Sequence, residues 1–82
     1  MEKITMYTAA WCGDCRAAKR YLGDKGIPFD EVDIERHPEA VRTVVAARGK
    51  RVLPTLEYKG KFIDGNHFNV DKFAKDLAEL LG

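Results

Sequence analysis

The chain has 82 residues, and its 14 Lys and Arg residues against 13 Asp and Glu residues leave a formal net charge of +1. This length suits one domain with a small core, which we expect to span residues 1–82. The balanced charge gives no electrostatic basis for binding nucleic acid or an anionic membrane. No apolar run approaches the roughly 20 residues that a membrane span needs, and polar residues interrupt the N-terminal segment where a signal peptide would be apolar. We expect a cytoplasmic protein and take it to be a monomer.

The first half of the chain predicts a strand, a helix and a second strand. Lys3–Thr8 is short, rich in β-branched residues and typical of a strand. Apolar residues recur at helical spacing over Gly13–Lys25, and Gly26 followed by Pro28 is a typical helix stop. Pro28–Glu35 alternates and contains Val and Ile, which indicates a second strand.

The next segments predict a helix and a β-hairpin. Pro38 suits the first turn of a helix, where its missing N–H has no helical partner to lose, and we expect this helix to end near Arg48–Gly49. Thr55–Tyr58 and Lys61–Asp64 flank Lys59-Gly60, a plausible two-residue turn between antiparallel strands.

A last helix completes the chain. Asn69 can cap its N-terminus, and Asp71 in its first turn complements the helix dipole. The order β-α-β-α-β-β-α predicts an α/β fold: a four-stranded mixed sheet, its first two strands parallel, with three helices covering both faces. The apolar residues expected to face the core are Val41, Val44 and Val45 in the second helix, and Val70, Phe73, Ala74, Leu77, Leu80 and Leu81 in the last.

Both cysteines of the chain lie between the first predicted strand and the first predicted helix. Structural disulfides are rare in the cytoplasm, and a bridge between Cys12 and Cys15 would close a very small loop, so the pair indicates redox chemistry or metal binding. Cys12 falls at the helix N-terminus, where unpaired N–H groups and the dipole favour a thiolate, the species that attacks disulfides. Cys15, one turn later, is close enough to resolve a mixed disulfide formed at Cys12.

The charged neighbours of the pair act in opposite directions. Asp14 lies between the cysteines and opposes thiolate formation if it faces the sulfur, whereas its effect is screened if it points to water. Arg16 and Lys19 favour the thiolate. The sequence leaves the direction of the Asp14 side chain open.

Metal binding is the main alternative for the cysteine pair. A zinc site usually has four ligands, and His37 and His67 lack the paired spacing that would complete one. Copper-carrying domains place a cysteine pair after their first strand, but their order is β-α-β-β-α-β. An iron–sulfur cluster bridging two copies remains open, as does an inactive adaptor. We predict thiol–disulfide exchange, with no resident metal or bound cofactor.

Three segments together, "MYTAAWCGDC", "PFDEVDIE" and "VLPTLEYKG", resemble the glutaredoxin branch of the thioredoxin superfamily over essentially the whole chain. Within that branch the likeness is greatest to mycoredoxins and related bacterial proteins. The resemblance implies a minimal thioredoxin fold in which Pro54 is cis and faces the cysteines. It also implies that Leu53 presents its backbone N–H and C=O to an extended substrate segment beside Cys12.

Departures from the family pattern bear on the substrate. Ala9 stands where glutathione-using members carry a lysine, and Asp14 replaces the tyrosine of the common CPYC loop. The segment 64–68 reads DGNHF, without the Gly-Gly and Ser/Thr-Asp pairs that hold the carboxylates of glutathione. We therefore expect, in this order, mixed disulfides of mycothiol or bacillithiol, a protein client reduced through the dithiol, and weakened use of glutathione. The electrons would come from such a small thiol or from a thioredoxin-type flavin reductase.

Further side chains are candidates for substrate contact. Trp11 borders Cys12 and is equally consistent with shielding the sulfur, contacting substrate or packing on the rim. His67 lies in the loop that the resemblance places near the cysteines, although a loop histidine without a functional role is the commoner case. Lys19 and Arg48 are candidates for steering anionic thiols.

Overall fold

The computed structural model describes residues 3–82, which form one four-stranded sheet and three helices. The β-α-β-α-β-β-α order and the mixed sheet confirm the predicted fold. In chain order the elements are β1 (Ile4–Thr8), α1 (Gly13–Asp24), β2 (Phe29–Asp33), α2 (Ala40–Arg48), β3 (Thr55–Tyr58), β4 (Lys61–Asp64) and α3 (Val70–Leu81).

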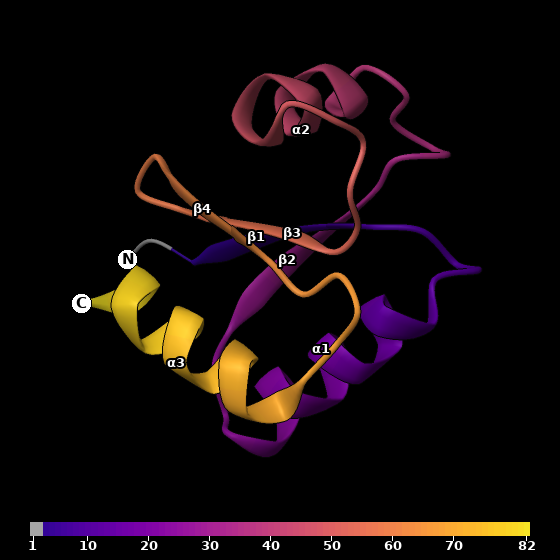
Figure 1. Ribbon diagram of the computed structural model, residues 1–82. Coiled ribbons are helices and arrows are strands. Elements are labelled where there is room, and N and C mark those ends of the chain that lie inside the picture. Colours follow the sequence, from indigo (N-terminus) through magenta and orange to yellow (C-terminus); the bar gives the residue numbers. More distant parts are fainter. Residues whose placement is uncertain (1–2) are drawn as a thin grey trace.

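The sheet has the strand order β2-β1-β3-β4, so β1 is an inner strand. It pairs parallel with β2 and antiparallel with β3, and β3 and β4 form the predicted hairpin. Helix α2 covers one face of the sheet, while α1 and α3 lie on the other (Figure 1). Because β1 is an inner strand, the segment that follows it begins between the ends of its two neighbouring strands.

Two hydrophobic clusters fill the space between sheet and helices. The cluster on the α1 and α3 face consists of Ile4, Met6, Ala18, Leu22, Leu56, Phe73, Leu77 and Leu80. The second cluster includes Val44 of α2 and consists of Tyr7, Ala9, Cys12, Cys15, Ile34, Val44, Val52 and Leu53. Both thiols therefore belong to the core on the α2 side.

Three of the apolar residues predicted to face the core are exposed instead, so the prediction was wrong for Val45, Val70 and Leu81. The buried residues of α3 are Phe73, Leu77 and Leu80, which form a stripe one side chain wide. A helix that contacts the sheet along such a narrow stripe leaves the apolar residues at its margins in solvent.

Two predicted boundaries also differ from the structure. Strand β2 ends at Asp33 because the Asp33 carboxylate accepts the N–H of Glu35 at 2.8 Å, a local bond that turns the chain out of the sheet. Pro38 lies in the turn before α2 rather than in its first turn, since the helix begins at Ala40. The end of α2 is as predicted, with Gly49 in the left-handed conformation at φ 79°.

Candidate active site

Cys12 is the N-cap of α1. Strand β1 ends at Thr8, and a short turn, in which the Cys12 N–H donates to the Ala9 carbonyl at 3.1 Å, carries the chain into the helix. The Cys12 Sγ accepts the backbone N–H of Cys15 at 3.1 Å. An N–H donor and the positive end of the helix dipole both stabilise negative charge on this sulfur. The geometry suits a thiolate nucleophile.

Cys15 lies in a different environment although it is only one helical turn away. Its side chain is fully buried. Burial, followed by the hydrogen bond with Cys12, raises the pKa of the Cys15 thiol to about 11. At neutral pH this thiol is therefore protonated and must lose its proton before its sulfur can act as a nucleophile.

Thr8 is a residue that the sequence interpretation did not single out. Its hydroxyl is buried and has no hydrogen-bond partner within residues 3–82. A hydrogen bond from the same hydroxyl to the thiolate form of Cys15 lowers the pKa of that thiol against the effect of burial. The only signal in the sequence was its place as the last residue of the strand before the cysteines, which by itself indicates no function.

A pocket of about 390 Å³ opens beside Cys12. Three segments contribute to it: the start of α1, the loop between α2 and β3, and the loop between β4 and α3. Its lining residues are Trp11, Cys12, Gly13, Asp14, Lys50, Arg51, Val52, Leu53 and Asn66. Trp11 is 60% exposed, and the Arg51 guanidinium lies 6.0 Å from the centre of its ring. The rim of the pocket thus combines an aromatic ring with positive charge.

The loop between α2 and β3 forms one wall of the pocket. The Leu53–Pro54 bond is cis, as the resemblance implies. The loop is held because the Thr55 hydroxyl donates to the Val52 carbonyl at 2.7 Å and the Pro54 carbonyl accepts the N–H of Gly65 at 2.9 Å. Among the residues described, the backbone N–H and C=O of Leu53 have no hydrogen-bond partner. Leu53 itself is one of the residues that line the pocket.

The Asp14 side chain reaches away from α1 to the loop that precedes α3. Its Oδ2 accepts the N–H of His67 at 3.0 Å, and its Oδ1 accepts the N–H of Phe68 at 3.1 Å. This answers the question that the sequence left open. The carboxylate is bound by two backbone donors rather than directed at the sulfur.

Comparison with known proteins identifies the family. The glutaredoxin family model matches residues 4–63. The chain belongs to the glutaredoxin family. With the pair Cys12 and Cys15 at the start of α1, it is a glutaredoxin-family thiol–disulfide redox protein.

Relatives of this glutaredoxin support the assignment. A Mycobacterium tuberculosis protein named as a glutaredoxin is 41% identical over 83 residues, covering 96% of this chain and 94% of the relative. Mycoredoxin 1 of Corynebacterium glutamicum is 30% identical, covering 98% and 95% of the two chains. The solved structure of the glutaredoxin-like protein NrdH-redoxin from Escherichia coli superposes with a TM-score of 0.74 at 31% identity, covering 90% of this chain and 93% of that one.

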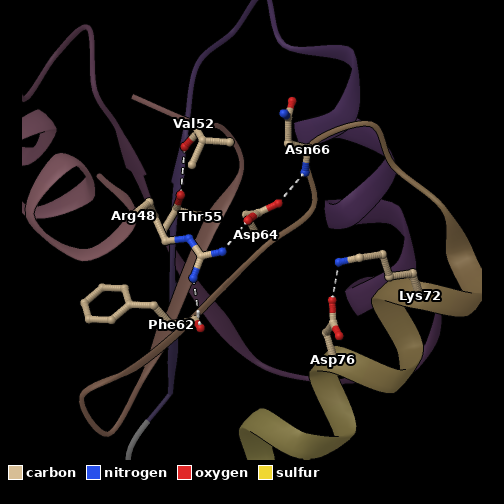
Figure 2. A network of polar contacts seen from close by, with 8 residues as sticks. All are labelled: Arg48, Val52, Thr55, Phe62, Asp64, Asn66, Lys72 and Asp76. Carbon is tan, nitrogen blue, oxygen red and sulfur yellow. Dashed lines mark hydrogen bonds and ion pairs between the residues drawn. The ribbon is translucent and has the colours of Figure 1, made fainter. Parts of the chain in front are cut away.

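The cations predicted to steer anionic thiols are ion-paired in this glutaredoxin. Lys19 binds Glu31 at 2.8 Å. Arg48 binds Asp64 and donates to the Phe62 carbonyl, and Asp64 also accepts the N–H of Asn66 (Figure 2). Arg48 therefore supports the edge of the pocket indirectly, through Asp64 and Asn66.

The cations that do line the pocket are Lys50 and Arg51, which the sequence interpretation missed. They follow the end of α2, and no local pattern indicates that this loop approaches the cysteines. His67 is not among the lining residues, whereas its neighbour Asn66 is. The backbone of His67, rather than its side chain, connects it to the site through Asp14.

Two further observations concern other classes of function. Within residues 3–82, no group of three or more His, Cys, Asp or Glu side chains is arranged to hold a metal ion. None of the helices over the same residues is long and apolar enough to cross a membrane.

Proposed function

We propose that the protein is a dithiol oxidoreductase that reduces disulfides in two steps. The Cys12 thiolate attacks a substrate disulfide, forms a mixed disulfide and releases the first substrate sulfur as a thiolate. Cys15 then loses its proton and attacks the Cys12 sulfur, which releases the second substrate sulfur. Two electrons pass to the substrate, and a Cys12–Cys15 disulfide remains. The observation that carries the proposal is the position of Cys12, which lines the pocket and whose sulfur caps α1 by accepting the N–H of Cys15 at 3.1 Å.

The pocket supports two kinds of substrate contact. The unpaired backbone groups of Leu53 can add an extended peptide in the manner of a β-strand, because a donor and an acceptor on one residue match those of a strand. Exposed Trp11 offers a flat apolar surface to the same ligand. Pro54 supports Leu53 from the protein side, through its bond to Gly65.

The proposed substrates are mixed disulfides of a small thiol, or a disulfide of a protein client. Mycothiol or bacillithiol comes first, because of the similarity to mycoredoxin 1. A protein client, with electrons from a flavin reductase, comes second. The similarity to NrdH-redoxin, whose structure is described for its thioredoxin-like activity profile, supports this alternative. Glutathione comes third. We place the reaction in the cytoplasm, where small thiols keep such a pair reduced.

Substitution of each cysteine tests the mechanism. Cys12→Ser removes the nucleophile and is expected to abolish turnover in a coupled disulfide-reduction assay. Cys15→Ser keeps the nucleophile but not the resolving thiol, so it is expected to accumulate a mixed disulfide detectable by mass spectrometry. Full activity of Cys12→Ser, or equal trapping by both variants, contradicts the assignment of roles.

A second experiment ranks the electron donors. The wild-type protein is oxidised to the Cys12–Cys15 disulfide and then mixed with mycothiol, bacillithiol, glutathione, or a thioredoxin-type reductase with NADPH. We expect mycothiol or bacillithiol to regenerate the dithiol fastest. Faster regeneration by the flavin reductase supports the protein-client alternative. Purified protein that carries stoichiometric iron or copper would argue for metal carriage instead.

A further inference from the structure

Asp14 provides a carboxylate that is bound within the protein beside the nucleophile. The two carboxylate oxygens each accept one backbone N–H, from His67 at 3.0 Å and from Phe68 at 3.1 Å. These partners lie 53 and 54 positions along the chain, so the contact is tertiary and not part of the helix cap. The cap of α1 is supplied by Cys12 itself.

The loop that precedes α3 is shaped to bind such a group. His67 has a positive φ of 54°, an uncommon conformation for a residue other than glycine. A residue in this conformation turns consecutive N–H groups toward one side, which forms a concave site for an anion. The nearby helix does not need these donors, because Asn69 caps α3 by accepting the N–H of Lys72 at 3.0 Å. The amide pair of His67 and Phe68 therefore serves a carboxylate, and in this structure that carboxylate is Asp14.

The amide pair is linked to the pocket of Cys12 by two residues that line this pocket. Asp14 and Asn66 both line the pocket that contains Cys12, and Asn66 directly precedes the amide pair. Lys50 and Arg51 line the same pocket. A small thiol joined to Cys12 would thus meet two cations, and its carboxylates would compete with Asp14 for the amide pair.

We propose that Asp14 determines which small thiols the protein accepts, by occupying the amide pair of His67 and Phe68 with an internal carboxylate. A thiol that carries carboxylates, such as glutathione or bacillithiol with its malate group, loses these two donors and meets a like charge. Mycothiol has no carboxylates, and neither does an uncharged peptide segment. Such ligands do not need the two backbone donors and lose no binding energy when Asp14 occupies them. Of the two thiols ranked first above, mycothiol is therefore favoured. This inference rests on the proposed function, in which Cys12 forms mixed disulfides with such thiols.

The test uses a ligand that cannot react. S-methylglutathione is titrated into 15N-labelled, reduced wild-type protein and into Asp14→Ala, and the amide resonances of His67 and Phe68 are followed by NMR. In Asp14→Ala the two donors are vacant, so we expect these resonances to shift saturably, with about tenfold or greater gain in affinity over the wild type. The dimethyl ester of S-methylglutathione, which lacks carboxylates, is expected to show no such gain.

Two further variants separate the amide pair from net charge. Asp14→Asn removes the same charge but keeps one oxygen acceptor, so it should gain less affinity than Asp14→Ala. It also preserves part of the contact if Asp14→Ala fails to fold. Asp24→Ala, at the other end of α1, removes an equal charge outside the pocket and should gain nothing.

Equal gains in Asp14→Asn and Asp14→Ala would overturn the proposal, because net charge alone would then explain them. Wild-type binding with the same shifts at His67 and Phe68, or no gain in Asp14→Ala, would overturn it as well. None of these outcomes depends on catalysis. Rapid alkylation of Cys12 and trapping by Cys15→Ser test the proposed function separately.

Discussion

The two clusters that pack against the sheet differ in what they bury. The cluster with α1 and α3 contains only apolar side chains, including Leu22, Phe73 and Leu77. The cluster with Val44 of α2 contains both thiols, and the hydroxyl of Tyr7 donates from it to Glu57 at 2.9 Å. The first cluster stabilises the fold, whereas the second places reactive and polar groups at the end of β1.

The difference shows how a small protein holds a reactive sulfur in place. Helix α1 is shared between the two clusters: its Ala18 and Leu22 pack in the first, while Cys15 packs in the second. The first cluster therefore fixes the helix that positions the cysteines. Substitutions in the two clusters should have separable consequences for stability and for thiol chemistry.

The largest effect on stability is expected in the purely apolar cluster. Leu77→Ala removes a buried side chain and leaves a cavity, so it should lower the free energy of unfolding by about 2–5 kcal/mol. The folded fraction should still alkylate Cys12 at the wild-type rate. Urea denaturation and timed iodoacetamide labelling measure the two quantities.

The matched control is Leu81→Ala on the same helix. Leu81 is exposed, so the free energy of unfolding of this variant should stay within about 0.5 kcal/mol of the wild-type value. A slowed alkylation rate in folded Leu77→Ala would show that the clusters are not separable.

The next largest effect is a pH dependence that belongs to the other cluster. The fold raises the pKa of Cys15 from 9.0 to about 11 because it buries the neutral thiol. Because the pKa of Cys15 is higher in the folded than in the unfolded chain, its burial contributes fully to stability below pH 9, and this contribution is lost as the pH rises toward 11. Between pH 9 and 11 this loss lowers the free energy of unfolding by roughly 2–3 kcal/mol.

Urea denaturation of the reduced protein between pH 8 and 11 measures this loss. Cys15→Ser lacks the titrating group and should lose less stability over the same interval. Burial, followed by the hydrogen bond to Glu57, raises the pKa of Tyr7 to about 12. Tyr7 therefore loses its contribution to stability at high pH in both proteins, and the difference between their stability curves reports on Cys15. Parallel curves for the two proteins would contradict the burial argument.

Local signals were sufficient to predict the fold and the cysteine pair. The turn at Lys59-Gly60, the cap at Asn69 and the position of Cys12 before α1 each depend on a few neighbouring residues, and the structure contains all three. These features arise from backbone hydrogen bonding within one turn or hairpin, which is why the sequence indicates them directly.

The contacts that shape the pocket could not be predicted in the same way. Asp14 meets His67 and Phe68 only because α1 and the loop before α3 come together in the folded chain. Lys50 and Arg51 reach the pocket for a similar reason. The sequence showed charges at these positions, but charge alone does not distinguish a solvated side chain from one held at a site.

The smallest predicted effect concerns the hydroxyl of Thr8. Thr8→Val keeps the shape of the side chain and removes a buried group that has no partner in the dithiol form, so the free energy of unfolding should change by less than about 0.5 kcal/mol or rise. The same change removes the donor that favours the Cys15 anion, so the pKa of Cys15 should rise. Release of a mixed disulfide from Cys12 should then slow by roughly two- to tenfold at neutral pH, while the first attack by Cys12 is unaffected. Stopped-flow measurement of the two phases separates them.

Thr55→Val is the matched control, because its hydroxyl is equally buried but donates to Val52, and its loss should cost about 1 kcal/mol without raising the pKa of Cys15. An unchanged second phase in Thr8→Val would show that the hydroxyl does not act on Cys15.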